Sequence, residues 1–245
     1  MPSLKQYRSQ IASVKNTRKI TQAMKMVAAA KLKKAQDRAQ AAQPFAAAMA
    51  GILARLAGSM TAGSSAPKLL TGSGADNKHL FIVISSDRGL AGGFNANVIR
   101  FARQQMQFLQ SNGKQVELIV VGRKARDVMR RELGDMLIGS HESGLAAFSM
   151  AEDIAREITE RFNAGQFDVA TLIYNEFKSV LVQKPTNLQL IPFQLDTSAV
   201  AVDTTPAEFE PSEEEVLAEI LPRNLAVQIY RALLDSSAGE QIGRA

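Results

Sequence analysis

The sequence predicts an α/β protein in which a long N-terminal coiled-coil helix is followed by a compact α/β domain. Two observations carry this prediction. The first fifty or so residues have no glycine before Gly51 and a single interior proline, Pro44, and strong helix formers dominate them. Downstream, short apolar runs alternate with helical patterns, which is typical of parallel strands joined by helices. The expected organisation is a shaft helix at residues 1–58, a flexible linker at 59–77, the α/β domain at 78–200, and a return segment with the start of a C-terminal helix at 201–245.

The N-terminal helix is expected to project from its own domain. From Ser3 to Leu56 it would span roughly 80 Å, about twice the width of a globule of this size. A core helix of a large all-α domain is the alternative, which the length disfavours. Pro44 should bend the helix because it removes one backbone donor. Apolar residues recur three and four apart, as in a coiled-coil seam: Leu4, Tyr7, Ile11 and Val14, then Leu32, Ala35, Ala39, Ala42, Ala46, Met49, Leu53 and Leu56.

Positive charge is concentrated in the first part of this helix. Residues 1–40 hold ten basic side chains and one acidic one, a net charge of +9, whereas the whole chain carries +5 and the remainder therefore −4. A basic helix beside an acidic body indicates a polyanionic partner, which can be nucleic acid, anionic lipid or an acidic protein surface. A solvated lysine face is the simpler alternative. The chain has no Trp and only 6% aromatic residues, which disfavours a surface that stacks nucleic-acid bases.

The α/β domain is expected to contain three buried strands separated by helices. Each strand is a short apolar run bounded by turn residues, and each helix carries apolar residues on one face. The strands are expected at His79–Ser86, Val116–Gly122 and Asp168–Phe177, and the helices at Asn95–Gln110, Lys124–Glu132 and Ala151–Phe162.

Three further segments frame this domain. Gly58–Asn77 is rich in Gly, Ser, Ala and Thr and is expected to be a flexible loop. Residues 180–193 alternate around Pro185–Asn187, which predicts an antiparallel hairpin at a sheet edge with its turn at those residues. The last helix is expected to begin near Glu213 and to be interrupted at Pro222.

No catalytic, cofactor or metal site is predicted. The loop Asp87–Gly93 lies between a strand and a helix, as a phosphate-binding loop would, but it matches neither glycine-rich phosphate pattern and offers no lysine. Its glycines more simply permit a tight turn. His79 and His141 lie outside any metal-ligand spacing, and the chain has no cysteine. The acidic run from Glu208 to Glu215 could bind a cation, but it more simply begins a helix.

Four motifs resemble one known family. They are Val14–Gln36 (VKNTRKITQAMKMVAAAKLKKAQ), Ser85–Asn97 (SSDRGLAGGFNAN), Tyr174–Pro185 and Leu233–Gln241. In this order they closely resemble segments of the γ subunit of F-type ATP synthase, and the resemblance covers nearly the whole chain. The first two motifs are long and specific, so chance does not explain them.

The resemblance implies a mechanical rather than a catalytic role. It implies a central rotor stalk, made of a coiled coil and a Rossmann-like domain without a nucleotide. The coiled coil turns inside a ring of α and β subunits, while the domain and the ε subunit rest on the membrane c-ring, so that proton flow drives ATP synthesis on other subunits. The implied location is the cytoplasmic face of the bacterial inner membrane, with the mitochondrial matrix side as the alternative. No cofactor and no nucleic acid is implied, and membrane contact comes only through partners.

The resemblance also indicates which residues meet these partners. None of them is expected to take part in bond making. Contact with the catalytic ring is expected at Lys15, Arg18, Lys19, Met24 and Lys25, and contact of the foot with the membrane ring and the ε subunit at Arg88, Gly89, Leu90, Phe94, Phe209, Glu210 and Pro211.

Two points leave alternatives open. The family continues into a long C-terminal helix that winds around the first helix, whereas this chain stops at Ala245 and its tail from Ile242 does not match that continuation. The seam on the first helix is therefore expected to need a partner. Two other functions fit parts of the pattern, namely a basic coiled-coil nucleic-acid-binding protein and a Rossmann-type nucleotide-binding enzyme.

Overall fold

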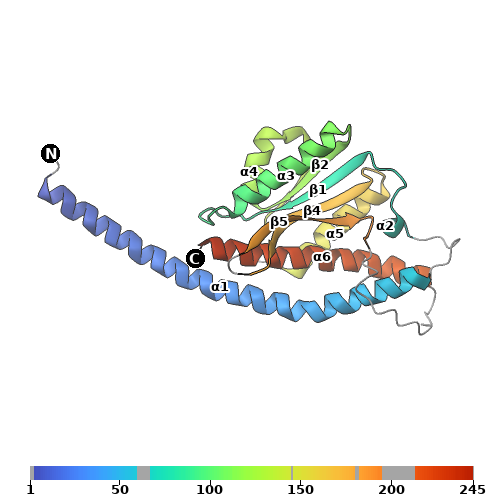
Figure 1. The fold of residues 1–245 in the computed structure, drawn as a ribbon, viewed down its shortest axis with the longest axis horizontal. Coiled ribbons are helices and arrows are strands. Elements are labelled where there is room, and N and C mark those ends of the chain that lie inside the picture. The colour runs from blue at the N-terminus through green and yellow to red at the C-terminus, as the bar shows by residue number, and fades with distance from the viewer. Residues whose placement is uncertain (1–2, 60–66, 145, 180–181, 195–212, 245) are drawn as a thin grey trace.

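The computed structural model describes residues 3–59, 67–144, 146–179, 182–194 and 213–244, and Figure 1 labels most of its elements. The strands are β1 (Lys78–Ile84), β2 (Gln115–Val121), β3 (Leu137–His141), β4 (Val169–Phe177) and β5 (Gln183–Ile191). The helices are α1 (Leu4–Ser59), α2 (Lys68–Thr71), α3 (Phe94–Ser111), α4 (Arg123–Glu132), α5 (Phe148–Asn163) and α6 (Glu213–Arg244), with a 3-10 turn at Gly134–Met136.

The predicted α/β class is confirmed, and each predicted strand and helix of the domain is present within a few residues of its expected bounds. One strand was missed. Strand β3 contains Gly139 and Ser140 and has no apolar run, so its sequence carries no strand pattern. It forms because it pairs with β2 at the edge of the sheet, where its residues are only partly buried.

The sheet has the strand order β3-β2-β1-β4-β5. The first four strands are parallel, and β5 runs antiparallel to β4. Helices α3 and α4 cover one face, and α5, α6 and the second half of α1 lie on the other, as two apolar clusters show. The chain adds β2 and β3 on one side of β1 and then returns to add β4 on the other side. The sheet therefore has a topological switch point between β1 and β4.

Strand β5 corrects the prediction of a turn at Pro185–Asn187. These residues lie inside β5, opposite Ile173–Asn175 of β4. Because β5 is the edge strand, a proline that lacks an N–H can be accommodated there without breaking the ladder. The connection from β4 to β5 lies beyond Phe177, where the backbone N–H groups of Lys178 and Ser179 donate to the Val182 carbonyl.

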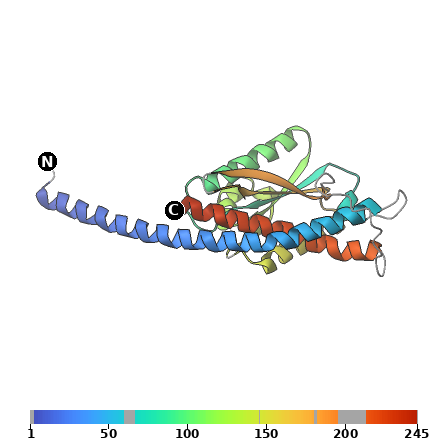
Figure 2. The same ribbon diagram turned by 60° about the horizontal axis from the view of Figure 1, so that its bottom comes forward.

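Helix α6 lies between the sheet and α1 (Figures 1 and 2). Its buried leucines share one apolar cluster with Met49 of α1 and with residues of β1 and β4. Pro222 lies inside a continuous helix, so the prediction that it interrupts α6 is wrong. A proline in a helix interior costs about 3 kcal/mol. Each fully buried leucine contributes about 1.5–3 kcal/mol, so the burial of Leu217, Leu221 and Leu225 outweighs that cost.

Among the residues that the structure describes, only the second half of α1 has a helical partner. Ala28, Ala35, Met49 and Leu53 are buried where α1 contacts α6, and the alanines allow close approach. The helix is bowed (Figure 1), and Pro44 lies inside it without ending it. The first half extends past the domain, as Figures 1 and 2 both show. It exposes the predicted seam and its neighbours: Leu4, Tyr7, Ile11, Val14, Ile20, Met26 and Val27.

The predicted flexible linker is corrected in its second part, while residues 60–66 lie outside the described residues. Helix α2 packs Leu69 into the core. The Asp168 carboxylate accepts the backbone N–H groups of Asn77 and Lys78, each at 2.9 Å, and the Ser73 hydroxyl at 2.7 Å. Residues 73–78 are therefore attached to the sheet through Asp168.

The projecting half of α1 should exchange its amide hydrogens rapidly in the isolated chain. A helix without tertiary contacts gains little stability in water, so we expect little protection over Leu4–Val27 and strong protection over Ala28–Leu53. Hydrogen exchange at low concentration measures both segments in one sample, and β1 supplies the protected reference. Strong protection of Leu4–Val27 in a verified monomer would contradict this expectation.

Candidate interaction surface

A groove separates α1 from the end of the sheet at which the parallel strands terminate. It encloses about 790 Å³. One wall is the Ile20–Arg38 stretch of α1. The opposite wall consists of the loops that follow β1, β2 and β3, together with the last turns of α6. The long helix α1, the loops at the end of the sheet and the C-terminal helix α6 therefore meet at this groove.

The groove combines an apolar lining with an excess of positive charge. Its two acidic side chains are already engaged, since Glu240 pairs with Arg244 at 2.8 Å and Asp87 accepts backbone hydrogen bonds. Such a surface suits an acidic partner that also offers apolar contacts. The apolar side chains lining it include Ile20, Met24, Val27, Ala28, Ala35 and Leu234, and the basic ones are Lys31, Lys34, Arg38, Arg88, Arg123 and Arg244.

Asp87 holds three strand ends together. Its Oδ1 accepts the backbone N–H groups of Arg123 at 3.0 Å and Ser143 at 3.1 Å, and its Oδ2 accepts that of Gly144 at 2.8 Å. Burial raises the pKa of this carboxyl, but the backbone hydrogen bonds from Gly144, Arg123 and Ser143 outweigh that effect and hold the pKa of Asp87 below its ordinary value. Because these residues follow β1, β2 and β3, one carboxylate fixes the wall of the groove.

The loop between β1 and α3 is held firmly and yet contains a strained residue. The backbone N–H of Ser86 donates to Asn95 Oδ1 at 3.0 Å, and the Ser86 hydroxyl donates to the Arg88 carbonyl at 2.7 Å. Leu90 has a φ of 59°, and its side chain is 81% exposed. A left-handed backbone costs a residue with a Cβ about 1–2 kcal/mol, so the surrounding contacts impose this conformation.

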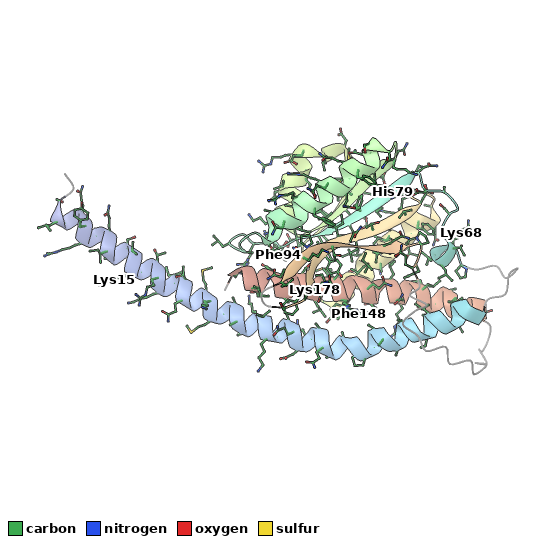
Figure 3. The ribbon with its side chains drawn as sticks, viewed as in Figure 1. Lys15, Lys68, His79, Phe94, Phe148 and Lys178 are labelled. Atoms are coloured by element: carbon green, nitrogen blue, oxygen red, sulfur yellow. The ribbon has the colours of Figure 1, made fainter. Side chains whose placement is uncertain are left out.

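The end of α6 occupies the crevice in which an open α/β sheet would bind a ligand. That crevice lies outside the carboxyl ends of β1 and β4. A Cβ at Gly243 would overlap the Ala91 carbonyl group, and one at Gly239 would lie 3.1 Å from the Phe94 ring. The Asn175 amide closes the other side by donating to the Phe94 carbonyl at 3.2 Å. Figure 3 labels Phe94 near the end of α6. The last turns of α6 therefore occupy part of this crevice.

Two ionisable groups lie where α6 meets β4. Burial raises the pKa of Asp235 to about 6, although Arg231 opposes the shift, and Glu176 adds to it. Burial also raises the pKa of Tyr174 to about 12, and the charges of Asp235 and Glu176 reinforce this shift. For Asp235 the folded state favours the neutral acid. Its contribution to stability is therefore present at low pH and is lost as the pH rises through about 6.

The residues predicted to meet the catalytic ring lie on or beside the projecting half of α1. Lys15 (labelled in Figure 3), Arg18, Lys19 and Lys25 are exposed, and Met24 is half-buried in the groove. At about 100° per residue, the four bases fall within a sector of about 120° on one flank of the helix. Within the described part of the chain, none of these four side chains has a hydrogen bond or ion pair.

The structure describes only some of the residues that the sequence analysis grouped at one foot. Arg88 lines the groove beside α1, and Gly92 packs against Gly243 near the C-terminal end of α6. Phe209–Pro211 lie outside the described residues. Arg88, Gly89, Leu90 and Phe94 belong to the end of the domain beside the projecting helix, and their contact with the membrane ring and the ε subunit stays a prediction.

Sequence reasoning missed Asp87 as a structural centre and Arg123 and Arg244 as parts of the groove wall. One signal was available, because Asp87, Arg123 and Ser143 each follow a strand of a parallel sheet and such loops converge at one edge. Which of these loops become neighbours depends on the strand order, which the alternation of strands and helices does not specify. Arg244 joins them only because α6 folds back across the sheet.

Neither a metal site nor a membrane-spanning helix occurs within the described residues. They contain no group of three or more His, Asp or Glu side chains that could hold a metal ion. Among the helices in the described ranges, none is both long enough and apolar enough to cross a membrane.

Comparison with known proteins identifies relatives along the whole chain. The family described as ATP synthase matches residues 3–245. The ATP synthase gamma chain of Parvibaculum lavamentivorans is 51% identical, with 98% of this chain and 84% of that one covered. That of Ruegeria sp. is 47% identical, with 100% and 85% covered. Among solved structures, a central stalk chain of the Tetrahymena thermophila mitochondrial ATP synthase has 29% identity and a TM-score of 0.68, with 92% of this chain and 96% of that one covered. A Euglena gracilis rotor chain with 19% identity and a TM-score of 0.64 shares the fold, with 98% and 87% covered.

Replacing Asp87 by Asn should destabilise the isolated chain. The amide nitrogen cannot accept, so at least one of the three N–H groups loses its partner, and a hydrogen bond to a charged group contributes about 1.5–3 kcal/mol. Urea unfolding at pH 7 measures the difference from wild type. Asp153→Asn is the matched control, because Asp153 is exposed and pairs only at the surface with Arg156, and we expect less than about 0.5 kcal/mol for it.

The destabilisation should depend on pH in a defined direction. The pKa of Asp87 is lowered on folding, so its ionised form contributes stability above the unfolded value of about 3.8, and this stability is lost as the pH falls through the folded pKa. The difference between wild type and Asp87→Asn should therefore be constant from pH 5 to pH 8 and shrink in more acidic solution. A difference that grew toward low pH would contradict the assigned hydrogen bonds.

Proposed function

Because the chain belongs to the gamma chain family of ATP synthase, we propose that it is the shaft through which proton flow at the membrane changes the conformation of catalytic sites on other subunits. Its role as a central rotor stalk subunit rests on the family and on the likeness to the Tetrahymena central stalk. One observation carries the mechanism, namely that α1 is anchored on its domain over its second half and free over its first. A shaft of this kind needs stiffness and an asymmetric surface rather than reactive groups.

The projecting half of α1 is the part that meets the ring of α and β subunits. Lys15, Arg18, Lys19 and Lys25 are exposed on one flank, and Met24 lies at the mouth of the groove. This one-sided charge suits acidic surface on the ring. Since the bases do not surround the helix, contact with any single catalytic subunit changes as the shaft turns.

The opposite end of the molecule is the foot. The segment Phe209–Pro211 leads into the start of α6, and we assign it to contact with the ε subunit and the membrane c-ring. The complex is peripheral to a membrane, and its relatives are bacterial, so the cytoplasmic face of the inner membrane is the proposed location. Binding to the membrane itself comes only through these partners.

The chain has no catalytic site of its own in this proposal. The crevice at the switch point of the sheet holds the end of α6, with Gly243 against Ala91 and Gly239 against Phe94. The loop Asp87–Gly93 uses its carboxylate to bind backbone N–H groups that a phosphate would otherwise compete for. ATP is therefore made and hydrolysed on other subunits.

Removing the basic flank should weaken coupling without preventing assembly. Partly exposed ion pairs contribute about 0–1 kcal/mol each, so the variant with Lys15, Arg18, Lys19 and Lys25 all changed to Ala should still assemble. Without these charges, the ring favours particular rotational positions of the shaft less strongly. Proton uptake per ATP hydrolysed should therefore fall. Both rates are measured together on the reconstituted complex in vesicles.

The matched control removes the same charge from the far face of the domain, by changing Arg100, Arg126, Arg130 and Arg131 of α3 and α4 to Ala. These residues lie away from α1, so coupling should match wild type. If the flank variant fails to assemble, or if both variants couple equally at low salt, the proposed role of the flank is wrong.

The isolated chain should bind no nucleotide with micromolar affinity, because α6 fills the crevice and the loop after β1 has no lysine. Equilibrium dialysis with ATP and with NAD measures this directly. Stoichiometric binding of either would contradict the proposal and favour a Rossmann-type enzyme.

A further inference from the structure

We propose that a recess in the crevice at the end of the sheet binds one water molecule, which bridges Ser236 and Glu240 of α6. This inference does not depend on the proposed function, because it concerns contacts within the chain. The bridge gives the last turns of α6 a polar contact in an interface that is otherwise mostly apolar, and so helps to fix their position against the sheet.

The recess lies between the end of β1, the segment after β3 and the last turns of α6. It encloses about 20 Å³, and one water molecule requires about 10–15 Å³. The recess therefore has the size of a single water molecule. Its walls include Ser143 and Gly144. These two residues also line the groove beside α1, which gives water a path from the solvent.

Ser236 is the side chain that needs a partner in this recess. It lines the recess and is only 4% exposed. Its hydroxyl has no hydrogen-bond partner among the residues that the structure describes. Leaving a buried hydroxyl unpaired is unfavourable, so such groups are normally bonded to protein or to ordered water. The neighbouring walls formed by Ile84 and Leu233 are apolar and offer no side-chain partner.

Glu240 supplies the second contact from one turn further along α6. Residues four apart lie on the same face of a helix, and Glu240 lines the recess together with Ser236. Arg244 donates twice to Glu240 Oε1, at 2.8 and 3.1 Å. Within the described part of the chain, no hydrogen bond or ion pair involves Glu240 Oε2. A water molecule can therefore accept from the Ser236 hydroxyl and donate to Glu240 Oε2.

The remaining groups around the recess favour water over a metal cation. The charge of Glu240 is already balanced by Arg244. The Ser85 hydroxyl is engaged, since it donates to the Val121 carbonyl at 3.0 Å and accepts the backbone N–H of Ala125 at 3.1 Å. A Ca²⁺ or Mg²⁺ ion takes about six or more oxygen ligands, whereas a buried water molecule needs about two to four polar partners.

Two substitutions test the Ser236 hydroxyl in the full chain. Ser236→Ala removes one hydrogen bond of the water, so the melting temperature should lie about 2–4 °C below that of Ser237→Ala. Ser237→Ala is the matched control, because it gives the same gain in helix propensity at the next residue of α6. Ser237 is half-buried at the groove, so solvent hydrates its hydroxyl. If Ser236→Ala melts at the temperature of the control or above it, the inference is overturned.

A structure of the wild-type chain at a resolution that shows ordered waters tests the site independently of stability. We expect one density peak in the recess, about 2.5–3.0 Å from both Ser236 Oγ and Glu240 Oε2, and we expect it to be weak or absent in Ser236→Ala. Three results would each contradict the proposal: no peak in the wild-type recess, a Ser236 hydroxyl bonded to a carbonyl of α6, or a peak with about six close oxygen ligands.

Discussion

The burial of α6 between the sheet and α1 is the contact on which the rest of the structure depends. Leu217, Leu221 and Leu225 are fully buried in the cluster that also contains Met49 and Leu53 of α1. Without α6, the second half of α1 would have no apolar surface to lie against, and the helix would have no fixed direction relative to the domain. The same helix places its last turns against the loop after β1, so one packing arrangement sets both the shaft and the groove.

The division of α1 into an anchored and a free half connects this packing to function. A helix transmits force only if one end is held, and the alanine-rich seam after Ala28 provides that anchor by allowing α6 to approach closely. Ahead of Ala28 the seam is exposed and flanked by bases that lack partners among the described residues. The free half is thus available to partners outside the chain, and the bases Lys15, Arg18, Lys19 and Lys25 lie on one flank of it.

The carboxyl end of the sheet is occupied by protein groups at the position where other α/β folds bind ligands. The crevice at the switch point is filled by Gly239 and Gly243 of α6, which approach the loop after β1 too closely for a side chain. Asp87 accepts backbone N–H groups from the loops after β2 and β3. These contacts make the loop between β1 and α3 rigid, and the rigid loop keeps Leu90 in a strained and exposed conformation. The edge of the sheet that binds ligands in other α/β proteins holds surface residues in fixed positions here.

The sequence by itself determined the long helix, the basic flank and the buried strands, because periodicity, charge and apolar runs are local properties. Its motifs also indicated the family, which the comparisons bear out. Only the tertiary structure decided where Arg88 and Leu90 lie, that Pro185 and Pro222 are accommodated inside β5 and α6, and that β3 exists at all. Each of these depends on a neighbour distant in the chain: the edge position of β5, the buried leucines around Pro222, the pairing of β3 with β2, and the return of α6 across the sheet. A local sequence pattern does not show which distant residues become neighbours. The free energies of packing and strand pairing with those neighbours exceed the local conformational preferences, so they decide the structure at these positions.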